Sequence, residues 1–400
     1  MNDPMEAVRR LLERGYRARA EDLPAALMEV APLLGVEKLC FYLVDYEQTA
    51  LRPLRDDDSS ARQALSVEGT LAGQAYTTMD AVQVDVPGGT QLWLPLLNGA
   101  ERLGVMEALT PSAVGRELRR DLRAVAAVVA ELVASRRHHG DTIEHTRRRL
   151  PMQLAAEIIW NQLPPLTFAT DDTAATAVLE PCYDVGGDAF DYAVNGCVFH
   201  VALFDTVGHG ISASALTTLA VNGYRNARRC GLTLRDTYSS VDKWVRAQYP
   251  GAFVTAILAE LDTSSGTYRR ICAGHPVELH LRDGRVIRQL PGPNALPLGL
   301  GHMRGQPPAI TEEELQPGDS ILFYTDGVTD ARSADGEFFG VEGLTRSVTE
   351  ALAHRAPPAE IMRRLLRAIL AHQHGELRDD ATAVLLQWRT KRTTRQTGWV

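Results

Sequence analysis

Apolar residues in the first third of the chain switch from helical to strand-like spacing. Residues 4–34 follow the helical period and predict two amphipathic helices, which separate near residues 20–22. Shorter apolar runs then predict strands, with one short helix inserted over residues 70–78. The predicted strands cover residues 38–46, 81–86, 91–97 and 102–109. This order indicates an α+β domain over residues 1–135.

A longer helix is predicted where apolar residues recur at alternating four- and three-residue spacing. This seam consists of Leu118, Leu122, Val125, Val129 and Leu132. Such spacing suits either a final helix that packs on its own sheet or a parallel dimer helix, and the sequence leaves both open. A second helix is predicted over residues 152–163. We expect a helical linker over 136–165, with a solvated basic run at 147–149, and a homodimer formed through this linker.

From residue 173 onward, predicted strands neighbour strands and predicted helices come in pairs. The helices cover residues 211–229, 234–248, 341–354 and 358–372. The strands cover residues 176–183, 190–194, 197–205, 252–262, 266–273, 277–282, 286–290, 320–325 and 381–388. This order favours two packed antiparallel sheets with helix pairs outside, over a domain of residues 166–390. Residues 391–400 are rich in basic and poor in apolar residues, which predicts a disordered tail.

Composition and charge narrow the class of protein. A net charge of -8 over 400 residues argues against nucleic acid as a partner, because phosphate backbones select basic surfaces. No run approaches the roughly 18 apolar residues of a membrane span, and the first residues lack an apolar signal core. We therefore expect a cytoplasmic protein without a membrane partner. The five cysteines form no C-x-x-C pair, which predicts buried free thiols and argues against zinc.

Four short acidic motifs lie at the ends of apolar runs in the second half of the chain. They are Gly186-Gly187-Asp188, Asp205-Thr206-Val207-Gly208-His209-Gly210, Thr325-Asp326-Gly327 and Asp379-Asp380-Ala381-Thr382. Each motif alone has a simple structural explanation as a turn, a hairpin or a strand start. Together they would gather several carboxylates, and buried carboxylates near one another need compensating charge. Oxygen ligands suit Mg²⁺ or Mn²⁺, with the Thr206 carbonyl as an additional ligand.

Five motifs in this order resemble the metal-dependent Ser/Thr phosphatases of the PPM (protein phosphatase 2C) superfamily, most of all the bacterial SpoIIE-type branch. Besides the first two motifs, the matching segments are Ala273–Pro276, Gly318–Thr329 and Asp379–Thr382. The resemblance covers residues 173–388. Separately, the segments 92–97 and 103–109 resemble the central hairpin of GAF domains.

The phosphatase resemblance implies an α-β-β-α sandwich with two Mn²⁺ or Mg²⁺ ions at one edge of the sheets. By position, the implied metal ligands are Asp188, Asp205, the Thr206 carbonyl, Asp326 and Asp379. The resemblance implies that Asp380 contacts these ligands rather than the metal ions. Asp191 is expected to be a strand residue or to make a water-mediated contact. The resemblance also implies that a metal-activated water attacks phosphorus, without a Ser or Cys nucleophile. The expected catalytic residues are Asp188, Asp205 and His209, with His209 as a candidate general acid. His275 is expected to be structural.

The same resemblance implies a function. The chain would hydrolyse phosphoserine or phosphothreonine on a separate protein, in this branch an anti-anti-sigma (STAS) regulator. The GAF-like N-terminal domain would act as a sensor of an unknown small ligand and control the phosphatase. The alternative is a catalytically weak, phosphatase-like scaffold that binds a ligand and a partner protein.

Overall fold

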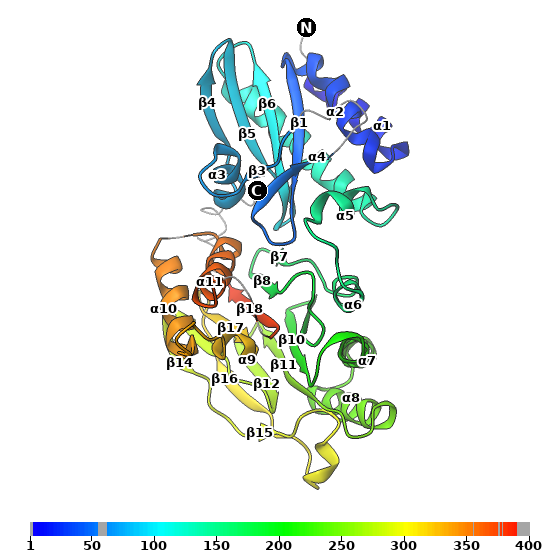
Figure 1. Ribbon diagram of the computed structural model, residues 1–400, viewed down its shortest axis with the longest axis vertical. Helices are drawn as coiled ribbons and strands as arrows, with labels where there is room; N and C mark the ends of the chain where they lie inside the picture. The colour runs from blue at the N-terminus through cyan, green and yellow to red at the C-terminus, as the bar shows by residue number, and fades with distance from the viewer. Residues whose placement is uncertain (1–2, 55–61, 355, 375–376, 378, 390–400) are drawn as a thin grey trace. The chain divides into compact units, whose positions relative to one another are not determined.

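A computed structural model describes residues 3–54, 62–354, 356–374, 377 and 379–389 (Figure 1). The chain divides into two compact units between Pro151 and Met152. The predicted tail over 391–400 lies outside the described residues. Within the described part of the chain, no helix is long and apolar enough to cross a membrane.

The N-terminal unit is built on one antiparallel sheet with the strand order β3-β2-β1-β6-β5-β4. The strands are β1 (Lys38–Val44), β2 (Ala50–Pro53), β3 (Leu65–Ser66), β4 (Val82–Val86), β5 (Gly89–Asn98) and β6 (Glu101–Thr110). The side chains of alternate residues in β1 point to opposite faces of the sheet, as in any β-strand. Leu39 and Phe41 join a core with α1 (Pro4–Arg17), α2 (Leu23–Val30) and α4 (Arg116–Arg136), whereas Tyr42 packs with α3 (Leu71–Thr78).

The seam of α4 is used inside its own unit. Leu122, Val125, Val129 and Leu132 are buried in the core that α4 shares with the sheet, and Leu118 packs against that core. Of the two uses that the sequence left open for this seam, the structure shows the final helix that packs on its own sheet. The homodimer through the linker stays a prediction.

The predicted linker over 136–165 divides between the two units. Helix α5 (Thr142–Arg147) packs on β1, and α6 (Leu154–Trp160) belongs to the C-terminal unit. Arg147 is buried: its Nε donates to the Val44 carbonyl at 3.2 Å, and its guanidinium lies 4.5 Å from the centre of the Tyr46 ring. The basic run at 147–149 is thus solvated only in part: Arg147 is buried, whereas Arg149 is exposed as we expected.

The C-terminal unit contains two sheets, with strand orders β15-β12-β11-β10-β9 and β14-β13-β17-β18-β8-β7; β16 also pairs with β12. The first sheet contains β9 (Ala189–Asn195), β10 (Val198–Thr206), β11 (Val254–Asp262), β12 (Thr267–Ala273), β15 (Asn294–Ala295) and β16 (Thr311–Glu314). The second contains β7 (Thr167–Ala169), β8 (Thr173–Glu180), β13 (Leu279–Arg282), β14 (Arg285–Gln289), β17 (Ser320–Tyr324) and β18 (Ala381–Trp388). All pairings are antiparallel except the short β12–β15 contact.

The two sheets pack face to face through one apolar core, in which Phe199 and Leu203 of the first sheet meet Phe323 and Val384 of the second. Helices α7 (Gly210–Arg229) and α8 (Leu234–Gln248) cover the outer face of the first sheet. Helices α10 (Gly340–Ala353) and α11 (Pro358–His372) cover the outer face of the second (Figure 1). The predicted α-β-β-α sandwich of antiparallel sheets is confirmed.

The five cysteines are free, but they differ in exposure. Cys40, Cys182 and Cys272 are buried as predicted, whereas Cys197 and Cys230 are exposed. Cys197 lies in the turn after β9, and Cys230 lies directly after α7. At both positions the chain has left the element that packs on the core, so the thiol is exposed.

Arg270 and Glu278 form an ion pair inside the sandwich and yield a stability prediction. Their side chains are 1% and 0% exposed, with 3.1 Å between Nη1 and Oε2. Replacing Arg270 with Met leaves the Glu278 carboxyl buried without its cation, so the free energy of unfolding should fall by about 3–5 kcal/mol. Chemical denaturation of the full chain measures this change.

The neighbouring Arg269 provides the matched control. It pairs with Glu312 in an exposed contact at 3.0 Å, so Arg269→Met should cost less than about 1 kcal/mol. An equal decrease in the free energy of unfolding for the two variants would show that burial does not determine how much the Arg270–Glu278 pair contributes to stability.

Candidate metal centre

The loop of the first acidic motif is held in place by the Asp380 carboxylate. Its Oδ2 accepts three backbone N–H groups, from Gly186 at 3.0 Å, Gly187 at 2.7 Å and Asp188 at 3.2 Å. A Cβ on Gly327 would collide with the Asp380 carbonyl, so the third and fourth motifs approach closely only because residue 327 is glycine. Asp380 therefore joins motifs that lie nearly two hundred residues apart in sequence.

Asp188 is buried at the junction of the two sheets, with 2% of its surface exposed. The Thr325 hydroxyl donates to its Oδ2 at 2.7 Å. Thr325 Oγ1 also accepts the backbone N–H of Thr382 at 3.0 Å, which fixes the orientation of the hydroxyl. The residue directly before Asp326 thus orients the carboxylate of a different motif.

Asp205 and Thr206 end β10 next to this loop. Thr255 on β11 donates its hydroxyl to Asp205 Oδ2 at 3.3 Å. The buried Thr217 hydroxyl on α7 lies 2.7 Å from both the Gly187 carbonyl oxygen and Thr206 Oγ1. Strand β10, helix α7 and the Gly-Gly-Asp loop are therefore joined around one hydroxyl group.

The carboxylates of the motifs are close enough to change one another's protonation. Burial, followed by the charges of Asp205 and Asp380, raises the pKa of Asp188 well above its usual value. Burial and the charges of Asp326 and Asp379 raise the pKa of Asp205 to about 7. Partial burial beside Asp379 raises the pKa of Asp326 as well. The structure thus brings together all four acids that the sequence predicted as ligands.

The chemistry of this set fits a hard divalent cation. Its donors are carboxylate oxygens, with the Thr206 carbonyl beside them, and Asp326 and Asp379 are exposed where an ion can reach them. Within the described residues, no group of three or more His, Cys, Asp or Glu side chains is arranged as a ready-made metal cage. Mg²⁺ commonly binds through one or two carboxylates and keeps several water ligands, so such a cage is not required.

The two histidines of the motifs lie in different environments. His209 is exposed and precedes the first residue of α7, so it stands beside the carboxylate edge without being buried in it. His275 is 3% exposed, and burial lowers its pKa to about 4. His275 is thus neutral at physiological pH and contacts the Pro276 carbonyl through Nδ1 at 3.1 Å, as a structural residue would.

Some residues of this edge were not identified from the sequence. Thr217 and Thr255 lie in an ordinary helix and strand, and Thr325 belongs to the third motif but had no predicted role; only the structure shows their contacts. Asp330 directly follows α9 (Asp326–Thr329), one turn after Asp326, and contributes to the raised pKa of Asp326. Asp191 is not part of the edge, because Arg225 and Arg228 bind its carboxylate at 2.7 Å and 2.9 Å.

A known protein family matches most of the C-terminal unit. Residues 196–389 match the family described as stage II sporulation protein E (SpoIIE). The match includes the Asp205, Asp326 and Asp379 motifs and begins after Asp188. This part of the chain is therefore similar to the SpoIIE family, as the motif order predicted.

Individual relatives are distant. The chain is 22% identical over 270 residues to protein IcfG of Synechocystis, covering 60% of this chain and 42% of that protein. It is also 22% identical over 213 residues to phosphoserine phosphatase RsbU of Bacillus subtilis, covering 53% and 62%. The chain thus spans less than two thirds of these relatives. A crystal structure of the RsbU and RsbW domains of Rv1364c from Mycobacterium tuberculosis has a TM-score of 0.47, with 25% identity and coverage of 56% and 62%.

The raised pKa values predict how stability depends on pH in metal-free protein. A carboxyl whose pKa is raised by folding binds its proton more tightly in the folded state, so stability falls as pH rises from its unfolded value near 4 through its folded value. Replacing Asp205 with Asn removes this penalty. At pH 8 the variant should be more stable than the parent by over about 1 kcal/mol, and at pH 4 the difference should vanish.

Denaturation in the presence of EDTA at both pH values measures this difference. The exposed Asp335, in the turn after α9, is the control, and Asp335→Asn should change stability equally at the two pH values. A pH-independent effect of Asp205→Asn would mean that the carboxylates do not repel one another in the folded chain.

Proposed function

We propose that this chain, whose residues 196–389 are similar to the SpoIIE family, is a metal-dependent protein phosphatase that acts on phosphoserine or phosphothreonine. The observation that carries the proposal is the convergence of Asp188, Asp205, Asp326 and Asp379 at one edge of the sandwich. No cationic side chain is among the causes that raise the pKa values of the first three. The name of the Bacillus subtilis relative, phosphoserine phosphatase, agrees with this activity.

The residues of the chain have separable roles in this proposal. Asp188, Asp205, the Thr206 carbonyl, Asp326 and Asp379 would hold Mn²⁺ or Mg²⁺. When bound, such ions lower the pKa of water and neutralise the charge of a phosphoryl group. Thr325 and Asp380 orient the ligands before any ion arrives. His209 is placed at the exposed rim, where a general acid can reach a leaving oxygen, and we retain it as a candidate for that role.

Substrate and control are finer proposals that rest on the family resemblance. The substrate would be a phosphorylated STAS-type anti-anti-sigma protein. The N-terminal unit, with the predicted GAF-like hairpin in β5 and β6, would sense a small ligand and regulate the phosphatase. Helix α6 supports the regulatory proposal, because Trp160 Nε1 donates to the Cys182 carbonyl at 2.7 Å and the Gln153 N–H to the Tyr183 carbonyl at 2.8 Å. These carbonyls lie just before the Gly-Gly-Asp loop.

The proposed activity is tested by Mn²⁺-dependent release of phosphate from a phosphoserine peptide or an aryl phosphate. Asp326→Ala should lower kcat by at least about 100-fold, since a missing ligand weakens both metal binding and phosphate neutralisation. Asp335→Ala removes a nearby exposed acid outside the edge and should leave turnover unchanged. Undiminished turnover of Asp326→Ala, or none in metal-loaded parent protein, would favour the scaffold alternative.

Control by the N-terminal unit is tested by truncation. A chain that starts at Leu150 keeps α6, and a chain that starts at Pro165 lacks it. We expect the first to differ from the full chain in basal kcat, and the second to need at least about tenfold more Mn²⁺ for half-maximal activity because the loop before Asp188 loses its support. Identical kinetics of all three proteins would count against regulation through α6.

A further inference from the structure

The hydroxyl of Thr217 is a buried polar group on the apolar side of α7. Its neighbours on that side, Leu216, Ala220 and Val221, belong to the core that α7 shares with the first sheet. Thr217 is 0% exposed, so its hydroxyl is removed from water. A buried hydroxyl costs stability unless it is hydrogen-bonded, and valine has nearly the same shape without that cost. What threonine adds at this position is therefore the set of contacts that its hydroxyl makes.

Three oxygen atoms lie within hydrogen-bonding distance of Thr217 Oγ1. The Gly187 carbonyl oxygen and Thr206 Oγ1 are each at 2.7 Å, and the Ala213 carbonyl oxygen is at 3.0 Å. A hydroxyl has one proton to donate and can accept from another donor, whereas a carbonyl oxygen only accepts. Thr217 can therefore donate to the Gly187 carbonyl while it accepts the proton of Thr206 Oγ1. In this arrangement the two hydroxyls form a short chain that ends at the Gly187 carbonyl.

Both ends of this chain lie at proposed metal ligands. Thr206 supplies the carbonyl of the ligand set, and Gly187 directly precedes Asp188. The two segments are in close contact, because a Cβ on Gly187 would lie 2.9 Å from the Thr206 carbonyl oxygen. The Gly187 carbonyl also accepts the backbone N–H of Thr206 at 3.3 Å. A shift of the Gly187 peptide would therefore move the Asp188 carboxylate relative to the Thr206 carbonyl.

The Gly187 peptide is held from both halves of the sandwich. Its N–H donates to Asp380 Oδ2 at 2.7 Å, and the Thr325 hydroxyl holds the side chain of the next residue, Asp188. Asp380 and Thr325 lie at the ends of β18 and β17, in the second sheet. Thr217 instead comes from the helix that covers the first sheet, and it contacts the carbonyl side of the same peptide. The loop is thus fixed between the two sheets.

We propose that Thr217 is a positioning residue for the metal centre. Its hydroxyl, together with that of Thr206, holds the Gly187 peptide where Asp188 and the Thr206 carbonyl can bind the same ion. Thr217 contacts neither the ion nor the substrate, and it acts through the Gly187 carbonyl. The inference rests on the proposed function only for the identity of the site, because binding of the ion can be measured without turnover.

Thr218, the next residue of α7, provides a matched control. Its hydroxyl donates to the Ser214 carbonyl at 2.7 Å, four residues earlier, just as Thr217 Oγ1 lies near the Ala213 carbonyl. The Thr218 side chain is partly buried, and the hydrogen bond of its hydroxyl stays within α7. Thr218→Val therefore removes a hydroxyl from the same helix without removing a contact to Gly187.

Titration of the metal-free full chain with Mn²⁺ tests the proposal, with free Mn²⁺ measured by electron paramagnetic resonance. Thr217→Val should raise the dissociation constant for Mn²⁺ at least about tenfold, because the Gly187 carbonyl and the Thr206 hydroxyl lose this partner. Thr217→Ser keeps the hydroxyl and should bind Mn²⁺ as the parent protein does. Thr218→Val should also leave the dissociation constant unchanged. Circular dichroism checks that each variant is folded.

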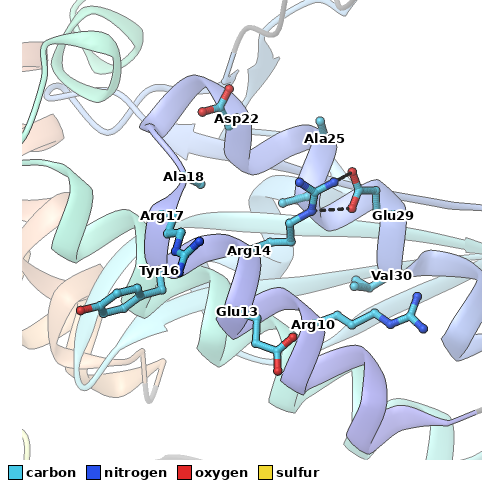
Figure 2. Close-up of a pocket in the computed structure, with 11 residues that line it drawn as sticks. Arg10, Glu13, Arg14, Tyr16, Arg17, Ala18, Asp22, Ala25, Glu29 and Val30 are labelled. Carbon is cyan, nitrogen blue, oxygen red and sulfur yellow. Dashed lines mark hydrogen bonds and ion pairs between the residues drawn. The ribbon is translucent and has the colours of Figure 1, made fainter.

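Acids outside the metal centre could add to the measured binding. The groove between α1 and α2 contains Glu13, Asp22 and Glu29. Each of these acids already pairs with an arginine, and Figure 2 shows the Arg14 guanidinium turned toward Glu29. These pairs neutralise the acids, so Glu29→Gln should leave Mn²⁺ binding unchanged, whereas Asp326→Ala should weaken it. The reverse result would place the measured ions in the groove and overturn the assignment.

Substitution of Thr206 tests the chain of hydroxyls. Thr206→Val keeps the backbone carbonyl, which is the proposed ligand, and removes only the hydroxyl that can donate to Thr217. It should weaken Mn²⁺ binding, and the double variant with Thr217→Val should bind little more weakly than Thr217→Val alone, because both substitutions break one chain. Effects that multiply in the double variant would show that the two hydroxyls act separately.

Two results would overturn the positioning role of Thr217. One is an unchanged dissociation constant in Thr217→Val, and the other is an equal weakening by Thr217→Val and Thr218→Val, which would be an effect on the helix and not on the loop. A parent protein that binds Mn²⁺ but releases no phosphate would contradict the proposed function alone. If Thr217→Val still weakened Mn²⁺ binding in that case, the positioning role would be supported.

Discussion

The repulsion between carboxylates at one edge of the sandwich is the constraint on which the C-terminal unit depends. Acidic side chains from four separate segments must be held together although neighbouring carboxylates raise the pKa values of Asp188, Asp205 and Asp326. The structure meets this demand with neutral donors. Three backbone N–H groups bind Asp380, and the Thr325 hydroxyl binds Asp188. The apolar core between the sheets then fixes the strand ends from which these groups project.

The long elements of the chain could be predicted because each one buries a complete face. Helices α8 and α11 have the predicted bounds, since their apolar positions repeat over several turns. The short strands β2, β3, β7, β15 and β16 were missed because two to four residues do not show a period. Asp326-Gly327 belongs to the one-turn helix α9 rather than to a hairpin. For the same reason Asp330 was missed, because its proximity to Asp326 depends on that helical turn.

Periodicity also cannot tell which surface covers an apolar face. The seam of α4 has the spacing of a dimer helix, yet its partner is the sheet of its own unit. Charge patterns have the same limit, as Arg147 shows. A basic run predicts solvent exposure, but Arg147 is buried because the Tyr46 ring and the Val44 carbonyl lie beside its guanidinium. In both cases the missing information is a contact between residues far apart in sequence, which no local pattern contains.

The same distinction separates functional acids from structural ones. Asp191 and Glu278 are buried acids with arginines as partners, and Asp319 receives two hydrogen bonds from Arg282 at 2.6 Å and 2.7 Å. Asp188 and Asp205 are also removed from water, but the groups that stabilise their charge are threonine hydroxyls. A hydroxyl orients a carboxylate without neutralising it, so the charge is left for a cation from solution. An acid that already has an arginine cannot attract a metal ion in this way, which separates the aspartates of the site from Asp191, Glu278 and Asp319.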